Sequence, residues 1–181
     1  GYGSGTVSFD TNGLQIDSTT SASTNRYYRY IAPTQVESWF VRATIMADSG
    51  GNLAFMQRGM EIGISTATND YQIQVRVSTT EISIVDANAA SVLATATVDP
   101  VGALQDTGVE IVVAHKLNKC SAWYRPADHN DAKSWRAIIQ DATLADGGVT
   151  GGTDHVSIGH VNVAGSSMES HIREWCVSYG S

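Results

Sequence analysis

The feature that most constrains this chain is an alternation of apolar and polar residues with a period of two. In the stretch 71–77, apolar residues occupy the odd positions, while Gln72, Gln74 and Arg76 occupy the even ones. Because successive side chains of an extended backbone point to opposite faces, this pattern predicts a strand with one buried and one solvated face. Helical spacing hardly occurs in the sequence, so the chain is predicted to be all-β.

Similar segments recur along the whole chain, separated by turn residues such as those at 11–13 and 68–70. The predicted strands are 6–9, 13–16, 26–31, 39–46, 60–65, 71–77, 81–86, 92–98, 108–115, 120–125, 135–139, 155–159 and 171–179. The strands 71–77 and 81–86 are joined by a short polar break, which predicts a hairpin. About a dozen short strands at this spacing indicate a sandwich or a barrel.

The length and composition of the chain favour a single hydrophobic core. The chain has 181 residues, of which 42% are hydrophobic and only 16% are charged. The segment 100–107 contains Pro100, Gly102 and Asp106, and strand patterning resumes directly after it. We therefore interpret this segment as a crossover between sheets. A single β-sandwich domain, residues 1–181, is expected, and we expect it to be part of a larger protein.

The charge balance argues against one class of partner. Eleven Lys and Arg against eighteen Asp and Glu give a net charge of −7, which would repel a phosphate backbone. No apolar run approaches the length of about 20 residues that a membrane helix needs, and no charged and then apolar leader opens the chain. We therefore expect neither nucleic acid nor a membrane as a partner, and we expect a mature or excised segment.

The order of the segments carries a resemblance to a known superfamily. The segments concerned are 9–16, 38–45 (SWFVRATI), 60–65 (MEIGIS), 71–86, 109–113 (VEIVV), 120–125 (CSAWYR), 157–160 and 172–179. In this order they resemble the concanavalin A-like lectin/glucanase superfamily, which includes laminin-G-like domains. The resemblance spans nearly the whole chain and implies a two-sheet antiparallel jelly-roll β-sandwich with one concave sheet. It also implies a superfamily in which sugar recognition is common.

The carboxylate arrangement of glycoside hydrolases on this fold is missing. Such hydrolases carry a strand motif E-x-D-x-x-E, because one carboxyl group protonates the leaving oxygen while another attacks or activates water. No such motif occurs, and Glu61 has no acidic neighbour. Glu169 and Glu174 are five residues apart, which predicts opposite faces of a strand. Hydrolysis by this constellation is not expected.

The polysaccharide lyases on the same fold leave a second enzyme class open. They neutralise a uronate carboxylate with Arg and Gln or Asn, while a His or Tyr moves protons. The polar positions of 71–77 share one strand face, and His115 and Tyr124 are candidates for the acid and base. However, Gln74 stands where the lyase-type Q-I-H strand has its His, so the expected base is missing.

A binding face requires less than an active site: aromatic side chains that stack on sugar rings, and polar groups that bond the hydroxyls. If the apolar positions of the strands face the core, their alternate positions face outward. The candidate ligand-binding residues on this basis are Arg42, Glu61, Gln72, Gln74, Arg76, Trp123 and Arg125. The alternative is that the polar positions are only the solvated side of strands. Trp39, Trp135 and Trp175 are expected in the core.

No cofactor is expected, although structural calcium stays open. The segment Asp128-His129-Asn130-Asp131 supplies oxygen ligands within one turn, and the resemblance implies relatives that hold calcium, but the full EF-hand ligand series is missing. His155, His160 and His171 are too dispersed to indicate zinc.

The two cysteines, Cys120 and Cys176, are too few for a disulfide framework. Both fall in predicted strands, where Cys often behaves as a small apolar core residue. We expect two free, largely buried thiols, with a single bridge between them as the alternative.

Together these observations predict a non-catalytic carbohydrate-binding or adhesion domain, lectin-like and extracellular, with a poly- or oligosaccharide as its partner. A second hypothesis is a bacteriophage or other virion module, in structural decoration or receptor binding, that forms a homo-oligomer or contacts other virion proteins. The three Lys residues and the Ser/Thr/Gly/Ala bias suit that role. A third hypothesis is a lyase or hydrolase with an unrecognised site.

Overall fold

The computed structural model describes thirteen β-strands and short flanking segments. The described residues are 6–10, 13–18, 25–31, 38–47, 60–65, 71–77, 81–86, 89, 91–98, 108–116, 119–127, 135–144, 155–161 and 168–180. Every strand predicted from the alternation is present, with bounds that differ from the prediction by a few residues. The described part of the chain contains no helix, so no helix there is able to cross a membrane.

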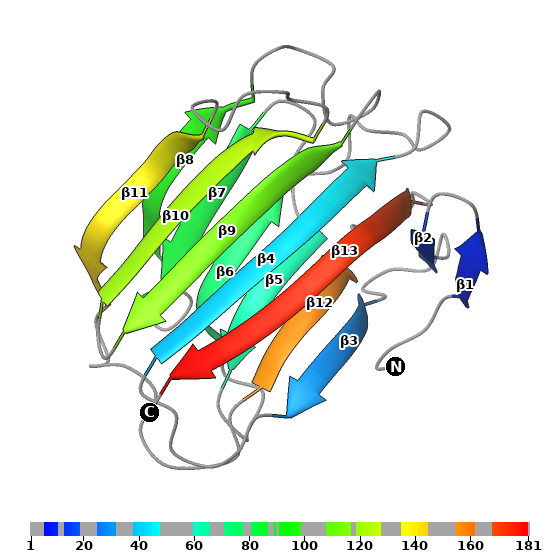
Figure 1. The fold of residues 1–181 in the computed structure, drawn as a ribbon, viewed down its shortest axis with the longest axis horizontal. Coiled ribbons are helices and arrows are strands. Elements are labelled where there is room, and N and C mark those ends of the chain that lie inside the picture. Colours follow the sequence, from blue (N-terminus) through cyan, green and yellow to red (C-terminus); the bar gives the residue numbers. More distant parts are fainter. Residues whose placement is uncertain are drawn as a thin grey trace.

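The strands form two antiparallel sheets that face each other (Figure 1). In its spatial order, the seven-stranded sheet consists of β1 (Thr6–Asp10), β2 (Gly13–Ser18), β13 (Met168–Gly180), β4 (Ser38–Ala47), β9 (Val109–Lys116), β10 (Lys119–Pro126) and β11 (Arg136–Thr143). The six-stranded sheet consists of β3 (Asn25–Ile31), β12 (His155–Val161), β5 (Met60–Ser65), β6 (Tyr71–Val77), β7 (Glu81–Asp86) and β8 (Ser91–Thr97). The prediction of an all-β sandwich is confirmed.

The core lies between the sheets and is built from the apolar phase of the strands. The seven-stranded sheet contributes Val41, Ala43, Ile45, Val109, Ile111, Val113, Cys120, Ala122 and Tyr124, and the six-stranded sheet contributes Ile73, Val75, Ile82 and Ile84, all of them buried. The Tyr124 hydroxyl donates a hydrogen bond to the carbonyl oxygen of Thr97 at 2.8 Å, which links β10 to β8 of the opposite sheet. This phase leaves the alternate residues of each strand on the outside of the sandwich.

The two cysteines lie in different environments, and both are free. Cys120 is buried on β10, whereas Cys176 is exposed on β13, and two further strands of the same sheet separate them. Burial, followed by the charge of Asp86, raises the pKa of the Cys120 thiol to about 11. The expectation of two free thiols is confirmed, and the alternative of a bridge is wrong. The expectation that both thiols are largely buried is wrong for Cys176, which is exposed.

Register shifts interrupt the regular pairing of β13 with β4, β10 with β11, β5 with β6 and β7 with β8. The pairing of β13 with β4 shifts register between Ile172 and Glu174. The expectation that Glu169 and Glu174 lie on opposite faces assumes an unbroken period of two, and this shift interrupts that period. Their side chains lie outside the part of the chain that the structure describes. Strand β11 continues past its predicted end through Asp141, which has a φ of 51° and whose amide donates to the Ser121 hydroxyl at 3.0 Å.

Candidate functional site

The predicted site residues are divided between the two sheets. Arg42 on β4 and Trp123 and Arg125 on β10 belong to the seven-stranded sheet. The remaining four, Glu61 on β5 and Gln72, Gln74 and Arg76 on β6, belong to the six-stranded sheet. The prediction that all seven residues form one surface is wrong, because the outer faces of two stacked sheets point away from each other.

In the six-stranded sheet, Glu61 and Arg76 are opposite each other in the register of β5 and β6. Arg76 is half-buried, and the apolar phase of β6, with Ile73 and Val75 in the core, is as predicted. The structure does not describe the side chains of Glu61, Gln72 and Gln74.

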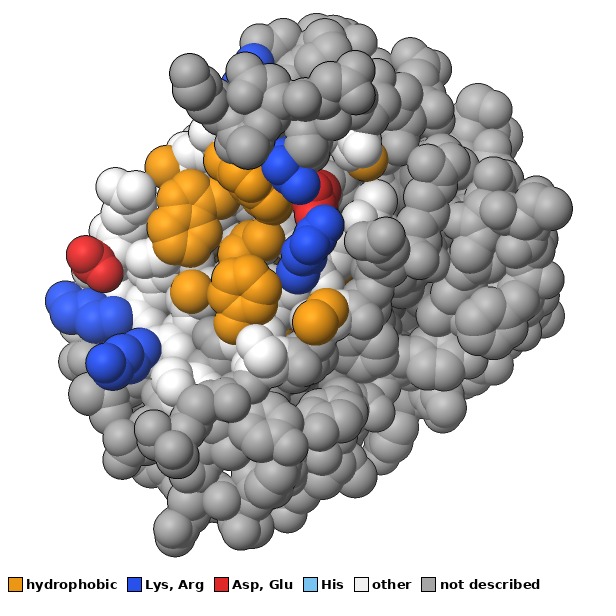
Figure 2. Space-filling model, viewed as in Figure 1, with side chains coloured by type: hydrophobic (Ala, Val, Ile, Leu, Met, Phe, Trp, Pro, Cys, Tyr) orange, Lys and Arg blue, Asp and Glu red, His pale blue; other side chains and the backbone are white. Residues whose placement is uncertain are grey.

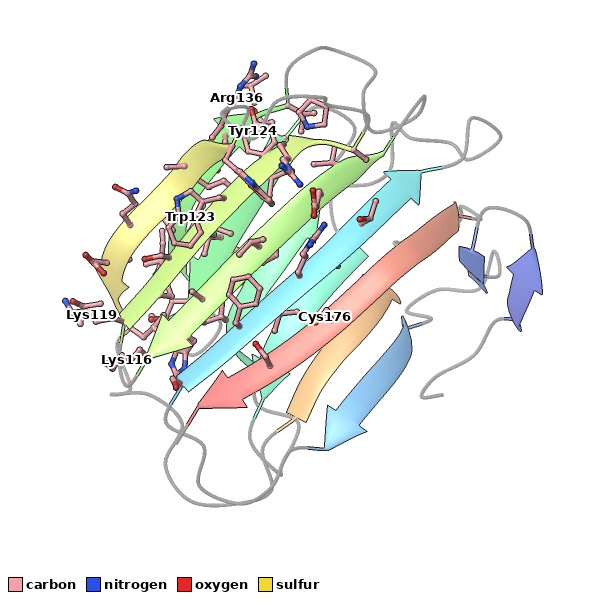
Figure 3. All side chains as sticks on the ribbon, viewed as in Figure 1. Lys116, Lys119, Trp123, Tyr124, Arg136 and Cys176 are labelled. Atoms are coloured by element: carbon pink, nitrogen blue, oxygen red, sulfur yellow. The ribbon has the colours of Figure 1, made fainter. Side chains whose placement is uncertain are left out.

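In the seven-stranded sheet, the predicted phase holds on each central strand. Val41 and Ala43 of β4 face the core, so Arg42 between them faces outward. Ala122 and Tyr124 of β10 are buried in the same way, which leaves Trp123 and Arg125 on the outer face. Figure 3 shows Trp123 on β10 and Cys176 on β13 on this side of the sheet.

Strand pairing gathers these outer residues into adjoining rows. Across β13, β4, β9, β10 and β11, the residues opposite one another are Cys176, Arg42, Val112, Trp123 and Ala137. The next row along the strands contains Thr44, Glu110 and Arg125. Residues that are up to 134 positions apart in the sequence therefore meet on one surface.

An apolar hollow lies at the centre of this surface. Its lining consists of Phe40, Val112, Trp123 and Trp135, and its volume is about 350 Å³. Phe40 is 40% exposed, which is unusual for a large apolar side chain of the described core strands. Figure 2 shows these strands from outside, with hydrophobic side chains gathered on the face and Lys, Arg and an acidic side chain beside them. We call this feature the aromatic hollow.

A charged cluster borders the aromatic hollow. Glu110, only 3% exposed, lies between two guanidinium groups. The Nε atom of Arg42 forms an ion pair with Oε1 of Glu110, and the Nε atom of Arg125 donates a hydrogen bond to Oε2 at 2.5 Å. We call these three residues the Arg–Glu–Arg cluster.

The cluster determines the ionisation of its carboxyl group. Burial raises the pKa of Glu110, but the hydrogen bond from Arg125 and the charges of Arg125 and Arg42 outweigh it, so the pKa lies below its usual value of 4.5. Glu110 is therefore ionised near neutral pH and joins two cations that would otherwise repel each other.

Arg125 joins the cluster to the hollow. Its guanidinium carbon lies 4.3 Å from the centroid of the Trp135 ring, a cation–π contact. The sequence of contacts from Arg42 through Glu110 and Arg125 to Trp135 thus positions one wall of the aromatic hollow.

Sequence reasoning missed four residues of this surface. Trp135 is half-buried in the wall of the hollow, so the expectation that it belongs to the core is wrong. Phe40, Glu110 and Val112 were not singled out. Glu110 did carry a signal, because a lone carboxylate in the apolar run 109–114 requires a cationic partner if it is buried. The structure does not describe the side chains of Trp39 and Trp175, so their expected place in the core stays a prediction.

The acid and base considered for a lyase do not face this surface. His115 and Tyr124 are 2% and 3% exposed, and they share the core-facing phase of their strands. Tyr124 reaches the opposite sheet with its hydroxyl. That pair therefore cannot meet a saccharide at the outer face, because both side chains point into the sandwich.

The described residues contain no group of three or more His, Cys, Asp or Glu placed to hold a metal ion. The segment Asp128–Asp131, in which the sequence leaves structural calcium open, lies outside the described residues, as do the side chains of His155, His160 and His171.

Comparison with known proteins finds likeness in structure and not in sequence. No protein-family model matches the chain, and no curated protein sequence matches it. The exoplasmic/lumenal domain of VIP36, bound to Ca²⁺ and Man3GlcNAc, is 11% identical over 99% of this chain and 84% of its own, with a TM-score of 0.66. A family 7 alginate lyase, A1-II′, in complex with product is 9% identical over 99% and 86%, with a TM-score of 0.66.

The alginate lyase from Klebsiella pneumoniae gives a TM-score of 0.68 at 9% identity, over 97% of this chain and 84% of that one. These proteins share the concanavalin A-like jelly-roll fold, so the resemblance inferred from the segment order is confirmed at the level of fold. The chain has the fold of a concanavalin A-like β-sandwich. Among these neighbours, the VIP36 domain is bound to Man3GlcNAc and the other two proteins are alginate lyases.

Proposed function

We propose that this protein is a carbohydrate-binding domain and that its saccharide binds on the outer face of the seven-stranded sheet, at the aromatic hollow. The observation that carries the proposal is the grouping of Phe40, Trp123 and Trp135 around one hollow. Pyranose rings present C–H faces that stack on such side chains, while the cluster beside them supplies hydrogen-bond donors for hydroxyls. Saccharides bound to a VIP36 domain of the same fold support this class of ligand.

The surface differs from an ordinary solvated strand face in two respects. A solvated face exposes its few apolar residues singly, whereas three aromatic rings and Val112 are contiguous here. The residues beside them are also held in place, because Glu110 bonds both Arg42 and Arg125. Preorganised side chains lose little conformational entropy when a ligand binds, which favours recognition.

A lyase is the second candidate function, and the alginate lyases among the neighbours favour it. The binding proposal is preferred because the acid and base that the sequence offered, His115 and Tyr124, are in the core. Incubation with polyuronates distinguishes the two functions. Ultraviolet absorbance from unsaturated products would establish the lyase, and its absence in the presence of binding would favour the non-catalytic domain. Location outside the cytoplasm, the virion role and oligomer formation stay predictions.

Trp123→Ala tests the proposal. Affinity electrophoresis in gels that contain neutral or acidic polysaccharides first identifies a polymer that retards the wild-type protein. Trp123→Ala is expected to weaken that binding at least about tenfold, equivalent to about 1.4 kcal/mol, because the side chain forms one wall of the hollow. Val92→Ala is the control, because Val92 is 60% exposed on β8 of the other sheet.

The folded state of each variant is checked by circular dichroism. Equal retardation of Trp123→Ala and wild type, or no retardation by any polysaccharide, would contradict the proposal. Loss of the folded state in Trp123→Ala calls for Trp123→Phe, which retains a ring in the hollow and is expected to retain most of the binding.

A further inference from the structure

The saccharide that the aromatic hollow recognises is an anionic one, we propose, and its carboxylate or sulfate group binds at the exposed side chain of Arg42. This inference rests on the proposed function and adds the chemical class of the ligand. It follows from the charge of the Arg–Glu–Arg cluster, from the different exposure of its two arginines, and from the position of Arg42 beside the hollow.

The cluster is a local positive site on an acidic protein. Among the side chains that the structure describes there, two guanidinium groups and one carboxylate sum to one positive charge, whereas the whole chain carries −7. An anionic polymer is repelled by such a protein in general, so it binds only where a cation offers direct contact. The cluster supplies that contact immediately beside the aromatic hollow.

The two arginines of the cluster, Arg42 and Arg125, have different roles. The Arg125 side chain is 14% exposed and is held between the carboxylate of Glu110 and the ring of Trp135. The Arg42 side chain is 42% exposed, and its ion pair with Glu110 is made through Nε. A guanidinium group carries five N–H donors in a planar fork, a geometry that matches the oxygens of a carboxylate or a sulfate. Arg125 is thus a positioning residue for the wall of the hollow, and Arg42 is the residue that meets the ligand.

The register places Arg42 at the correct distance from the ring platform. Arg42 is opposite Val112, and Val112 is opposite Trp123, so two strand spacings, about 10 Å, separate the backbones of Arg42 and Trp123. The long Arg side chain covers part of this span. A ring that stacks on Trp123 therefore brings a charged substituent within reach of the guanidinium group.

Other occupants fit the hollow less well. Aromatic cages recognise quaternary ammonium groups, but a net positive cluster beside the rings repels a cation. A neutral saccharide removes water from the Arg42 guanidinium group and offers only neutral acceptors in return. An anionic group makes charge-assisted hydrogen bonds, which are about twice as strong, and so offsets that loss of hydration.

The test uses matched pairs of polymers that differ in charge alone. Binding of wild-type protein is measured by isothermal titration calorimetry to polygalacturonate and to its carboxyl-reduced, neutral form, and to dextran sulfate and dextran. The ionic strength is about 0.15 M, at which charges more than about 8 Å apart are largely screened. Tighter binding to at least one acidic polymer, by about tenfold over its neutral partner, is expected. The two pairs distinguish a carboxylate ligand from a sulfate ligand.

Variants of Arg42 assign the effect to this residue. Arg42→Gln is expected to lose about tenfold in affinity for the preferred acidic polymer and almost nothing for its neutral partner, while Arg42→Lys retains most of the preference. Lys116→Gln removes the same charge from an exposed position at the far end of β9 and is expected to bind as wild type (Figure 3).

The outcomes separate this inference from the proposed function. Equal binding of acidic and neutral polymers, or equal losses in Arg42→Gln and Lys116→Gln, overturns the anionic class but leaves carbohydrate binding intact. Absence of binding to all four polymers overturns the anionic class. If affinity electrophoresis also finds no retaining polysaccharide, carbohydrate binding is overturned as well. If circular dichroism shows that Arg42→Gln is unfolded, Arg42→Lys replaces it in the comparison. The matched polymer pairs then still decide whether the ligand is anionic.

Discussion

Glu110 is expected to stabilise the fold as well as the Arg–Glu–Arg cluster, and Glu110→Gln measures by how much. The substitution preserves the size of the side chain and one acceptor oxygen but removes the negative charge that two arginines share. The contact with Arg42 involves a side chain that is 42% exposed, so its contribution is discounted to about 0.5 kcal/mol. The contact with Arg125, 14% exposed, is worth about 1.5 kcal/mol as a hydrogen bond between charged groups.

The expected loss in the free energy of unfolding is therefore about 2 kcal/mol, which corresponds to a decrease in Tm of about 4 to 8 °C for a domain of this length. Urea denaturation and thermal melting at pH 7 measure both quantities. Glu81→Gln is the control, because it removes the same charge from an exposed position on β7 and is expected to change stability by less than about 0.5 kcal/mol. Equal stability of the two variants would show that the buried position of Glu110 contributes nothing.

The pH dependence gives a second check with a definite sign. The pKa of Glu110 is lower in the folded protein than its usual value of 4.5, so ionisation favours the folded state. This contribution is complete above the unfolded-state pKa and is lost as pH falls through the folded-state pKa. The difference in stability between wild type and Glu110→Gln should therefore be constant from pH 7 to about pH 5 and decrease at more acidic pH. A difference that increases on acidification would refute the reasoning.

Two further predictions concern the core. Tyr124→Phe removes the hydrogen bond from β10 to the carbonyl oxygen of Thr97 on β8 and should lower the free energy of unfolding by about 1 kcal/mol, measured by urea denaturation; an unchanged midpoint would mean that the bond does not help to join the sheets. Cys176 is exposed and should react with a thiol reagent in the native protein, whereas Cys120, buried and with its pKa raised to about 11, should react only on unfolding. Rapid modification of both thiols under native conditions would contradict the placement of β10.

The strands themselves follow from local sequence. The alternation in 71–77 and 120–125 decides which residues of each strand face the core, and the structure has the same phase on both. This success is physical, because the pleat of a single extended chain sends successive side chains to opposite sides without reference to any partner. At the register shift between Ile172 and Glu174 the period of two is interrupted, so the same reasoning does not extend across it.

The site depended on information that no single strand holds. Arg76 and Arg42 both lie on strands of the predicted phase, yet strand pairing assigns them to different sheets. Conversely, Glu110 shows its role only when β9 is placed between β4 and β10, which brings one arginine to each side of it. Period-two patterning thus determined the strands and their buried sides, while long-range pairing decided which outer residues are neighbours, because each sheet is ordered by hydrogen bonds between segments far apart in the chain.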